Sequence, residues 1–132
     1  MKSIKIGICG LGTVGSGTFN VLAENSDLIA ARALAPIEIV HVGARRDNPQ
    51  CDTSAVKVSR DIFDVVKDPD VDIIVELIGG TTVARQLVED AIRAGKHVVT
   101  ANKALIAEVG NEIFALADEA GVSVRYEAAV AG

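Results

Sequence analysis

Short apolar runs and longer segments with helical spacing alternate along this chain. The apolar runs predict buried parallel strands, because such strands bury both of their faces and carry few polar residues. Between them, side chains on one face recur three and four positions apart, which is typical of amphipathic helices. The strands are expected at Ile4–Cys9, Ile37–Val42, Val56–Val58, Val71–Ile78, His97–Thr100 and Val122–Tyr126.

The expected helices lie between these strands, and capping or breaking residues mark their ends. They are expected to begin near Thr13, Asp61, Thr81 or Thr82, and Asn111. Strands that alternate with helices over short connections predict an α/β fold, a doubly wound and mostly parallel sheet with helices on both faces. The 132 residues are enough for one domain, and no function is predicted for residues 24–36.

The turn after the first strand carries an informative motif. Gly10-Leu11-Gly12-Thr13-Val14-Gly15 matches G-x-G-x-x-G between a predicted strand and a predicted helix. In a Rossmann-type fold these glycines allow a tight turn, a close approach of pyrophosphate to the backbone, and close helix packing. The helix N-terminus adds free N–H groups and a partial positive charge. All six residues are therefore predicted to bind a dinucleotide, and a turn used only for packing is the alternative.

The residues after the second strand bear on which dinucleotide is bound. NAD-selective domains usually place Asp or Glu there, in contact with the ribose hydroxyls. This chain has Arg45 and Arg46 instead, followed by Asp47. A guanidinium can form a forked contact with a 2'-phosphate, so the sequence favours NADP, while Asp47 leaves NAD open. Two solvated loop arginines are the alternative interpretation.

Two further loops follow strands of the predicted sheet, at the edge where ligands of open parallel sheets bind. One loop contains Gly79, whose lack of a side chain would let the backbone approach a ligand closely. The other is Thr100-Ala101-Asn102-Lys103, which offers an amide and an amine. We therefore expect Gly79, Thr100, Asn102 and Lys103 to contact the nicotinamide end of the cofactor.

Five other residues with reactive side chains are not included in the predicted site. Glu76 lies inside an apolar run, so it is expected to be either half-exposed or paired. His41 and His97 lie among valines and are interpreted as scaffold residues. Cys9 is expected to be a small buried residue, Cys51 lies in a polar loop, and the two lack metal-ligand spacing. We therefore predict no metal site, and the absence of a disulfide pattern fits the cytoplasm.

Composition and charge exclude other classes of partner. The net charge is -5, whereas surfaces for nucleic acid or anionic lipid need clustered Lys and Arg. Hydrophobic residues make up 49% of the chain but aromatic residues only 3%, so small aliphatic side chains must form the core. No apolar run approaches the roughly 18 residues of a membrane span. We expect no nucleic-acid partner, no membrane segment and no signal peptide.

Three blocks of sequence carry a resemblance to a known family. They are Gly7–Gly15, Val75–Gly80 and Gly95–Ala104, and the last two are more specific than the glycine turn alone. On these blocks, and on the final segment Tyr126–Gly132, the chain resembles homoserine dehydrogenase. The resemblance implies the NAD(P)-binding domain of an oxidoreductase that interconverts aspartate 4-semialdehyde and homoserine in the synthesis of threonine and methionine.

The resemblance also implies a role for Lys103 and a missing half. The matching lysine of the family lies where nicotinamide and substrate meet, and it is assigned to cofactor contact and to proton transfer. Family members continue beyond the position of Gly132 into a substrate-binding and dimerisation region. We therefore expect a homo-oligomeric parent enzyme, and we expect residues 1–132 alone to bind cofactor without turnover.

Two alternative functions stay open at this point. Another semialdehyde or lysine-branch oxidoreductase would share the glycine turn but not the block around Lys103. A semialdehyde dehydrogenase would also need a cysteine nucleophile, for which Cys9 and Cys51 are poorly placed. A regulatory or redox-sensing domain would bind a dinucleotide without needing a catalytic lysine.

Overall fold

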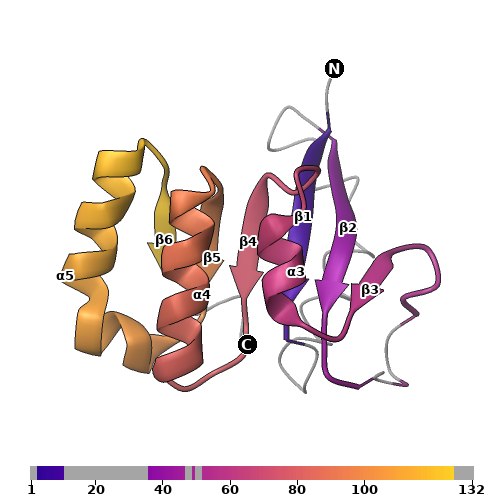
Figure 1. The fold of residues 1–132 in the computed structure, drawn as a ribbon, viewed down its shortest axis with the longest axis horizontal. Helices are drawn as coiled ribbons and strands as arrows, with labels where there is room; N and C mark the ends of the chain where they lie inside the picture. The colour runs from indigo at the N-terminus through magenta and orange to yellow at the C-terminus, as the bar shows by residue number, and fades with distance from the viewer. Residues whose placement is uncertain (1–2, 11–35, 47–48, 50–51, 127–132) are drawn as a thin grey trace.

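Six parallel strands form one sheet within the described residues, in the order β3-β2-β1-β4-β5-β6 (Figure 1). The structure is a computed structural model that describes residues 3–10, 36–46, 49 and 52–126. The strands are β1 (Ile4–Cys9), β2 (Ile37–Gly43), β3 (Lys57–Ser59), β4 (Ile73–Glu76), β5 (His97–Thr100) and β6 (Val124–Tyr126). The order runs outward from β1 on one side and from β4 on the other. Sheets of this kind bind ligands where the order reverses, which is here between β1 and β4.

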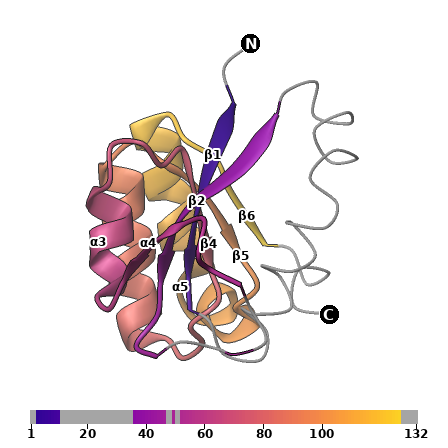
Figure 2. The same ribbon diagram turned by 90° about the vertical axis from the view of Figure 1, so that its right-hand side faces the viewer.

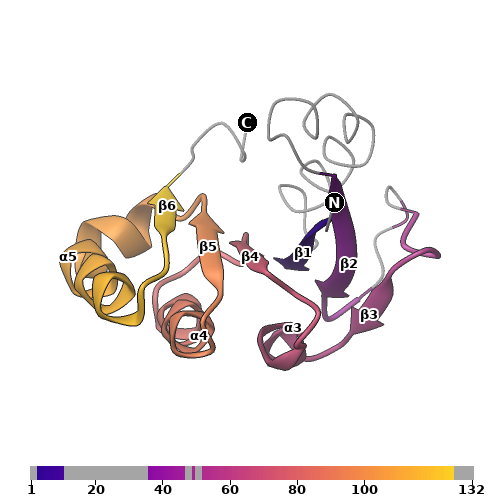
Figure 3. The same cartoon turned by 90° about the horizontal axis from the view of Figure 1, so that it is seen from above.

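Three described helices cover one face of this sheet (Figures 2 and 3). They are α3 (Ile62–Lys67), α4 (Thr82–Arg93) and α5 (Lys103–Ala120). The parallel α/β fold predicted from the sequence is therefore confirmed, while the helix expected from Thr13 lies outside the described residues. None of the described helices combines the length and the apolar character that a membrane crossing requires.

The first turns of α5 correct the sequence prediction, which placed the start of this helix near Asn111. The helix begins at Lys103, because Asn102 caps it: the Asn102 side-chain oxygen accepts a hydrogen bond from the N–H of Leu105 at 3.0 Å. Leu105 is fully buried and anchors this turn on the core. At Val109 the backbone leaves helical geometry (φ -135°, ψ 18°), so α5 contains a kink there.

Other boundaries differ from the prediction by a few residues. The run Val71–Ile78 forms a strand only over Ile73–Glu76, because the Val71 N–H donates to the carbonyl of Asp68 in a turn. At the other end, the N–H of Ile78 donates to the side chain of Glu76 rather than to a neighbouring strand. In α4, the apolar residue Val83 is 49% exposed, whereas Ala84 is fully buried.

Among the described residues, two groups of mainly aliphatic side chains form the core, one on each face of the sheet. The larger group joins α3, α4 and α5 to the strands, and includes Leu87, Ile92 and Ile113. The smaller group contains Ile6, Ile8, Val42, Ala44 and Val75. Each fully buried Leu or Ile contributes roughly 1.5 to 3 kcal/mol by removal of apolar surface from water. The near absence of aromatic residues is therefore offset by many close aliphatic contacts.

Candidate functional site

The carboxyl ends of four strands form one row across the sheet. The register places Cys9 of β1 between Gly43 of β2 and Glu76 of β4, and it pairs Glu76 with Thr100 of β5. In sequence, the predicted site residues follow directly after these four strand ends or include them. The topology therefore brings the predicted loops to a single edge, on both sides of the point where the strand order reverses.

Gly10 begins the glycine turn in a left-handed conformation, with φ of 104°. A Cβ at this position would lie 3.0 Å from the carbonyl carbon and oxygen of Leu77. The Gly10 N–H donates to the carbonyl of Gly43 at 2.8 Å, so Gly10 itself is held between β2 and β4. Both its φ and its surroundings therefore require glycine. The remaining motif residues, Leu11, Gly12, Thr13, Val14 and Gly15, lie outside the described residues.

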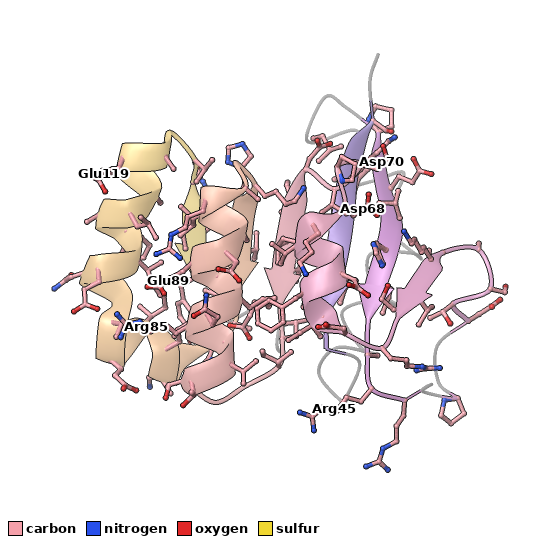
Figure 4. The ribbon with its side chains drawn as sticks, viewed as in Figure 1. Arg45, Asp68, Asp70, Arg85, Glu89 and Glu119 are labelled. Carbon is pink, nitrogen blue, oxygen red and sulfur yellow. The ribbon has the colours of Figure 1, made fainter. Side chains whose placement is uncertain are left out.

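Arg45 and Arg46 follow β2 and are both exposed. Arg45 projects from the same edge of the sheet, away from the core (Figure 4). The segment before it is fixed, because the Ala44 carbonyl accepts a hydrogen bond from the Arg60 guanidinium at 3.2 Å, and the Ala44 N–H donates to Ser59. Two guanidinium groups therefore start from a fixed backbone and reach the solvent at the edge of the sheet that contains Gly10.

The loop after β4 begins at a buried carboxylate. Glu76 has no exposed surface, and its Oε2 accepts a hydrogen bond from the N–H of Ile78 at 2.9 Å. Gly79 and Gly80 follow with φ of 73° and 71°, both in the left-handed region. Neither would meet another atom within 4 Å if it carried a Cβ, so the conformation and not the space requires glycine there. The loop presents bare backbone at the edge.

The loop after β5 combines one buried and one exposed polar residue. Thr100 is fully buried, and its hydroxyl donates to Oε1 of Glu76 at 2.7 Å. The same hydroxyl oxygen accepts from the N–H of Asn102 at 3.0 Å, while the Asn102 side-chain amide donates to the carbonyl of Gly80. Lys103 is the first residue of α5 and is exposed. The buried Thr100 therefore holds the loop through its hydrogen bonds to Glu76 and Asn102, whereas Lys103 is exposed and available to a ligand.

Cys9 lies beside this network and is fully buried. Burial raises the pKa of its thiol well above the usual range, and the negative charge of Glu76 raises it further. Its Sγ lies 3.8 Å from the carbonyl oxygen of Ile62, to which it donates. A thiol in this setting is a packing group, as the sequence predicted, and not a nucleophile.

The two histidines were interpreted as scaffold residues, and each has hydrogen-bond partners within the fold. His41 is fully buried on β2, and its ring nitrogens lie 2.7 Å from Oδ2 of Asp68 and 2.7 Å from Oγ of Ser59. The hydrogen-bonded sequence Asp68, His41, Ser59 is that of a hydrolytic triad, but the His41 side chain is almost completely buried, so we interpret it as a packing residue of β2. His97 lies at the amino end of β5 and accepts a hydrogen bond from the N–H of Ser123.

Sequence reasoning missed the partners of Glu76. It predicted that a carboxylate in an apolar strand would be exposed or paired, and the structure confirms pairing. Thr100 is 24 positions away in sequence, so only the strand register brings the two side chains together. The available signal was that Glu76 and Thr100 each end an apolar strand, because the carboxyl ends of parallel strands meet at one edge.

Comparison with known proteins identifies the family. The family model described as the NAD binding domain of homoserine dehydrogenase matches residues 10–127. The chain belongs to the homoserine dehydrogenase family. The resemblance predicted from three sequence blocks is thereby confirmed, and so is a nicotinamide dinucleotide as the class of cofactor.

Individual homoserine dehydrogenases agree over the whole chain. The enzyme of Pseudomonas aeruginosa is 63% identical over 132 residues, which are 100% of this chain and 30% of that protein. The enzyme of Bacillus subtilis is 40% identical and is covered to 31% of its length. The crystal structure of the Thiobacillus denitrificans enzyme superposes with a TM-score of 0.89 at 50% identity, over 97% of this chain and 30% of that one. This chain therefore spans about 30% of the length of these relatives.

Proposed function

We propose that this chain is the cofactor-binding domain of a homoserine dehydrogenase and that it binds NADP in preference to NAD. The observation that carries the proposal is the gathering of Gly10, Arg45 and Lys103 at one edge of the sheet, beside the reversal of strand order. In this fold the end of β2 faces the adenosine ribose, so an arginine there meets a 2'-phosphate. Contact with that charged phosphate would favour NADP.

The described residues fit a dinucleotide laid across this edge. Gly10 allows the tight turn that begins the motif, because its left-handed backbone disfavours a side chain. Gly12 would let the pyrophosphate approach the backbone. Arg45 and Arg46 would hold the 2'-phosphate. Gly79 and the segment 100–103 would lie along the nicotinamide half, with Asn102 and Lys103 as its polar groups. Thr100 would act through Asn102, because its own hydroxyl is buried and already bonded.

The proposed parent enzyme interconverts aspartate 4-semialdehyde and homoserine. A bound nicotinamide would supply hydride transfer to or from the substrate carbon. Lys103 is exposed at the first turn of α5, and we assign to it the proton of the substrate oxygen. Substrate contacts are proposed to come from the part of the parent enzyme that this chain does not span. We also propose a cytoplasmic, homo-oligomeric parent, and no turnover by residues 1–132 alone.

Calorimetric titration of the chain with NADPH and with NADH tests the cofactor proposal. The Arg45→Ala variant is expected to bind NADPH about ten-fold more weakly or worse, because it loses a hydrogen bond to a charged group. Its NADH affinity is expected to change little. Arg93→Ala, which removes an exposed arginine from the end of α4, serves as the matched control. If Arg45→Ala lowers the affinity for NADPH and for NADH equally, the contact between Arg45 and the 2'-phosphate is contradicted. If neither cofactor binds saturably to the unaltered chain, the proposal as a whole is contradicted.

A further inference from the structure

The side chain of Glu76 closes a ring of hydrogen bonds between the loops that follow β4 and β5. Its Oε2 accepts from the N–H of Ile78 at 2.9 Å, and its Oε1 accepts from the hydroxyl of Thr100 at 2.7 Å. The Thr100 oxygen accepts from the N–H of Asn102 at 3.0 Å. The side-chain amide of Asn102 donates to the carbonyl of Gly80, two residues beyond Ile78, and this completes the ring.

Each hydrogen bond in this ring has a defined donor and acceptor. The backbone N–H groups of Ile78 and Asn102 can only donate, so Oε2 of Glu76 and the Thr100 oxygen each accept one hydrogen bond, and the Thr100 hydroxyl donates its own proton to Oε1 of Glu76. A carboxylate accepts at both of its oxygens, whereas the nitrogen of a carboxamide would leave the Thr100 proton without its acceptor. Glu76 and Thr100 are each 0% exposed, so bulk water does not replace a lost partner.

The ring holds elements that themselves face the solvent. Asn102 caps α5 through Leu105, so the position of the ring sets the position of the first turn, where Lys103 is exposed. On its other side the ring fixes the exposed pair Gly79 and Gly80. Arg45 follows β2, which is separated from β4 and its loop by β1, so Arg45 lies outside the ring. Changes in the ring should therefore act on one half of the edge only.

We propose that Glu76 is a positioning residue for the nicotinamide half of the site. Its buried carboxylate sets the Gly79–Gly80 loop relative to the Lys103 turn, and it does so without contact with the cofactor. This inference rests on the dinucleotide function proposed above. It adds that the nicotinamide half depends on Glu76, whereas the adenosine half beside Arg45 does not.

The test is the Glu76→Gln variant, titrated with two probes. NADPH reaches both halves of the site, whereas 2',5'-ADP carries only the adenosine half with its 2'-phosphate. We expect NADPH to bind about ten-fold more weakly to Glu76→Gln, because the amide cannot accept both hydrogen bonds. Binding of 2',5'-ADP should change less than about two-fold, because the ring lies outside the adenosine half. Glu119→Gln makes the same chemical change at an exposed position of α5 and serves as the matched control (Figure 4).

A second pair of variants keeps the proposal testable if Glu76→Gln fails to fold. Thr100→Val removes the hydroxyl with little change of shape, and it should weaken NADPH binding as Glu76→Gln does. Thr100→Ser restores the hydroxyl and should recover most of the lost affinity.

The outcomes distinguish failure of the positioning role of Glu76 from failure of the proposed dinucleotide binding. Equal losses for NADPH and 2',5'-ADP, or no loss for either, would overturn the positioning role and leave dinucleotide binding intact. Failure of the unaltered chain to bind either probe would overturn the proposed function, and the inference with it.

Discussion

Each edge of the sheet contains a buried ionisable side chain whose partners are backbone groups or a hydroxyl. At the carboxyl edge this residue is Glu76, and at the amino edge it is Lys96, with 0% and 7% of the residue exposed. The Lys96 ammonium donates to the carbonyl oxygens of Asp68 and Val71, both at 2.7 Å. Burial lowers the pKa of Lys96, while the charges of Asp68 and Asp72 act in the opposite direction. Neither buried group lacks a hydrogen-bond partner, which is the condition for burying such groups.

The two residues differ in what their partners lead to. The hydrogen bonds of Glu76 support loops whose ends are exposed, at Gly79 and near Lys103. Those of Lys96 support the turn between α3 and β4, which contains Asp68 (Figure 4). Asp68 also binds the buried His41. The first network therefore shapes a surface that can receive a ligand, and the second secures packing. Burial alone does not reveal the role of a polar residue, but the exposure of the groups it holds does.

The largest expected effect is that of Lys96→Met. It leaves the buried carbonyl oxygen of Val71 without its lysine donor, whereas the partly buried carbonyl of Asp68 keeps the Val71 N–H. We therefore expect the free energy of unfolding to fall by about 2 kcal/mol in urea denaturation. Lys67→Met removes an exposed lysine from the end of α3 and should change stability by less than about 0.5 kcal/mol. NADPH affinity of the folded Lys96→Met protein should match that of the unaltered chain. A loss of NADPH affinity in Lys96→Met would contradict the assignment of ligand binding to the carboxyl edge and of packing to the amino edge.

A smaller effect is expected at Asp68, and it depends on pH. Burial acts to raise the pKa of Asp68, but hydrogen bonds from the Asp70 N–H and from His41, with the charges of His41 and Lys57, outweigh burial and hold the pKa below its usual value. Because the folded pKa lies below the unfolded one, the carboxylate stabilises the fold above the unfolded pKa of about 3.9. This contribution is lost as the pH falls through the folded pKa.

Asp68→Asn should therefore lower the free energy of unfolding by about 1.5 kcal/mol at pH 7, through the weakened contact with His41. It should also flatten the decline of stability between pH 5 and pH 2, which urea denaturation at several pH values would measure. Asp70→Asn neutralises a neighbouring exposed carboxylate and is the matched control. If the free energy of unfolding of Asp68→Asn falls as steeply toward acid pH as that of the unaltered chain, other carboxylates cause the loss of stability.

The order of strands and helices was predictable from the sequence because each element buries its own apolar face. β1, β2 and β5 lie within a residue of the predicted bounds, since their apolar runs end at glycine or at polar residues. The start of α5 was not predictable in this way. The segment Ala101-Asn102-Lys103 has loop composition, and Gly110 interrupts the helical pattern where the kink at Val109 lies.

The candidate site was predictable as a set of loops but not as a network. Gly10, Arg45 and Lys103 follow strand ends, and a parallel sheet necessarily brings such ends together. The link between Glu76 and Thr100 depends on register, which the apolar pattern of strands buried on both faces leaves undetermined, because a shift along such a strand keeps it apolar. The donor and acceptor roles in the ring become visible only once the two strands are paired.

The smallest expected effect is at Asn102, which belongs to the fold and to the site at once. Asn102→Ala loses the cap of α5, so we expect about 1 kcal/mol less stability as well as weaker NADPH binding. Asp is an equally good cap, so Asn102→Asp should keep the stability within a few tenths of a kcal/mol. It cannot donate to the carbonyl of Gly80, however, so its NADPH affinity should still fall.

Thermal denaturation and calorimetry on the two variants would measure both the stability and the NADPH affinity. If Asn102→Asp binds NADPH like the unaltered chain, the link to Gly80 serves packing alone, and the carboxyl edge would resemble the amino edge more closely than its exposed loops indicate.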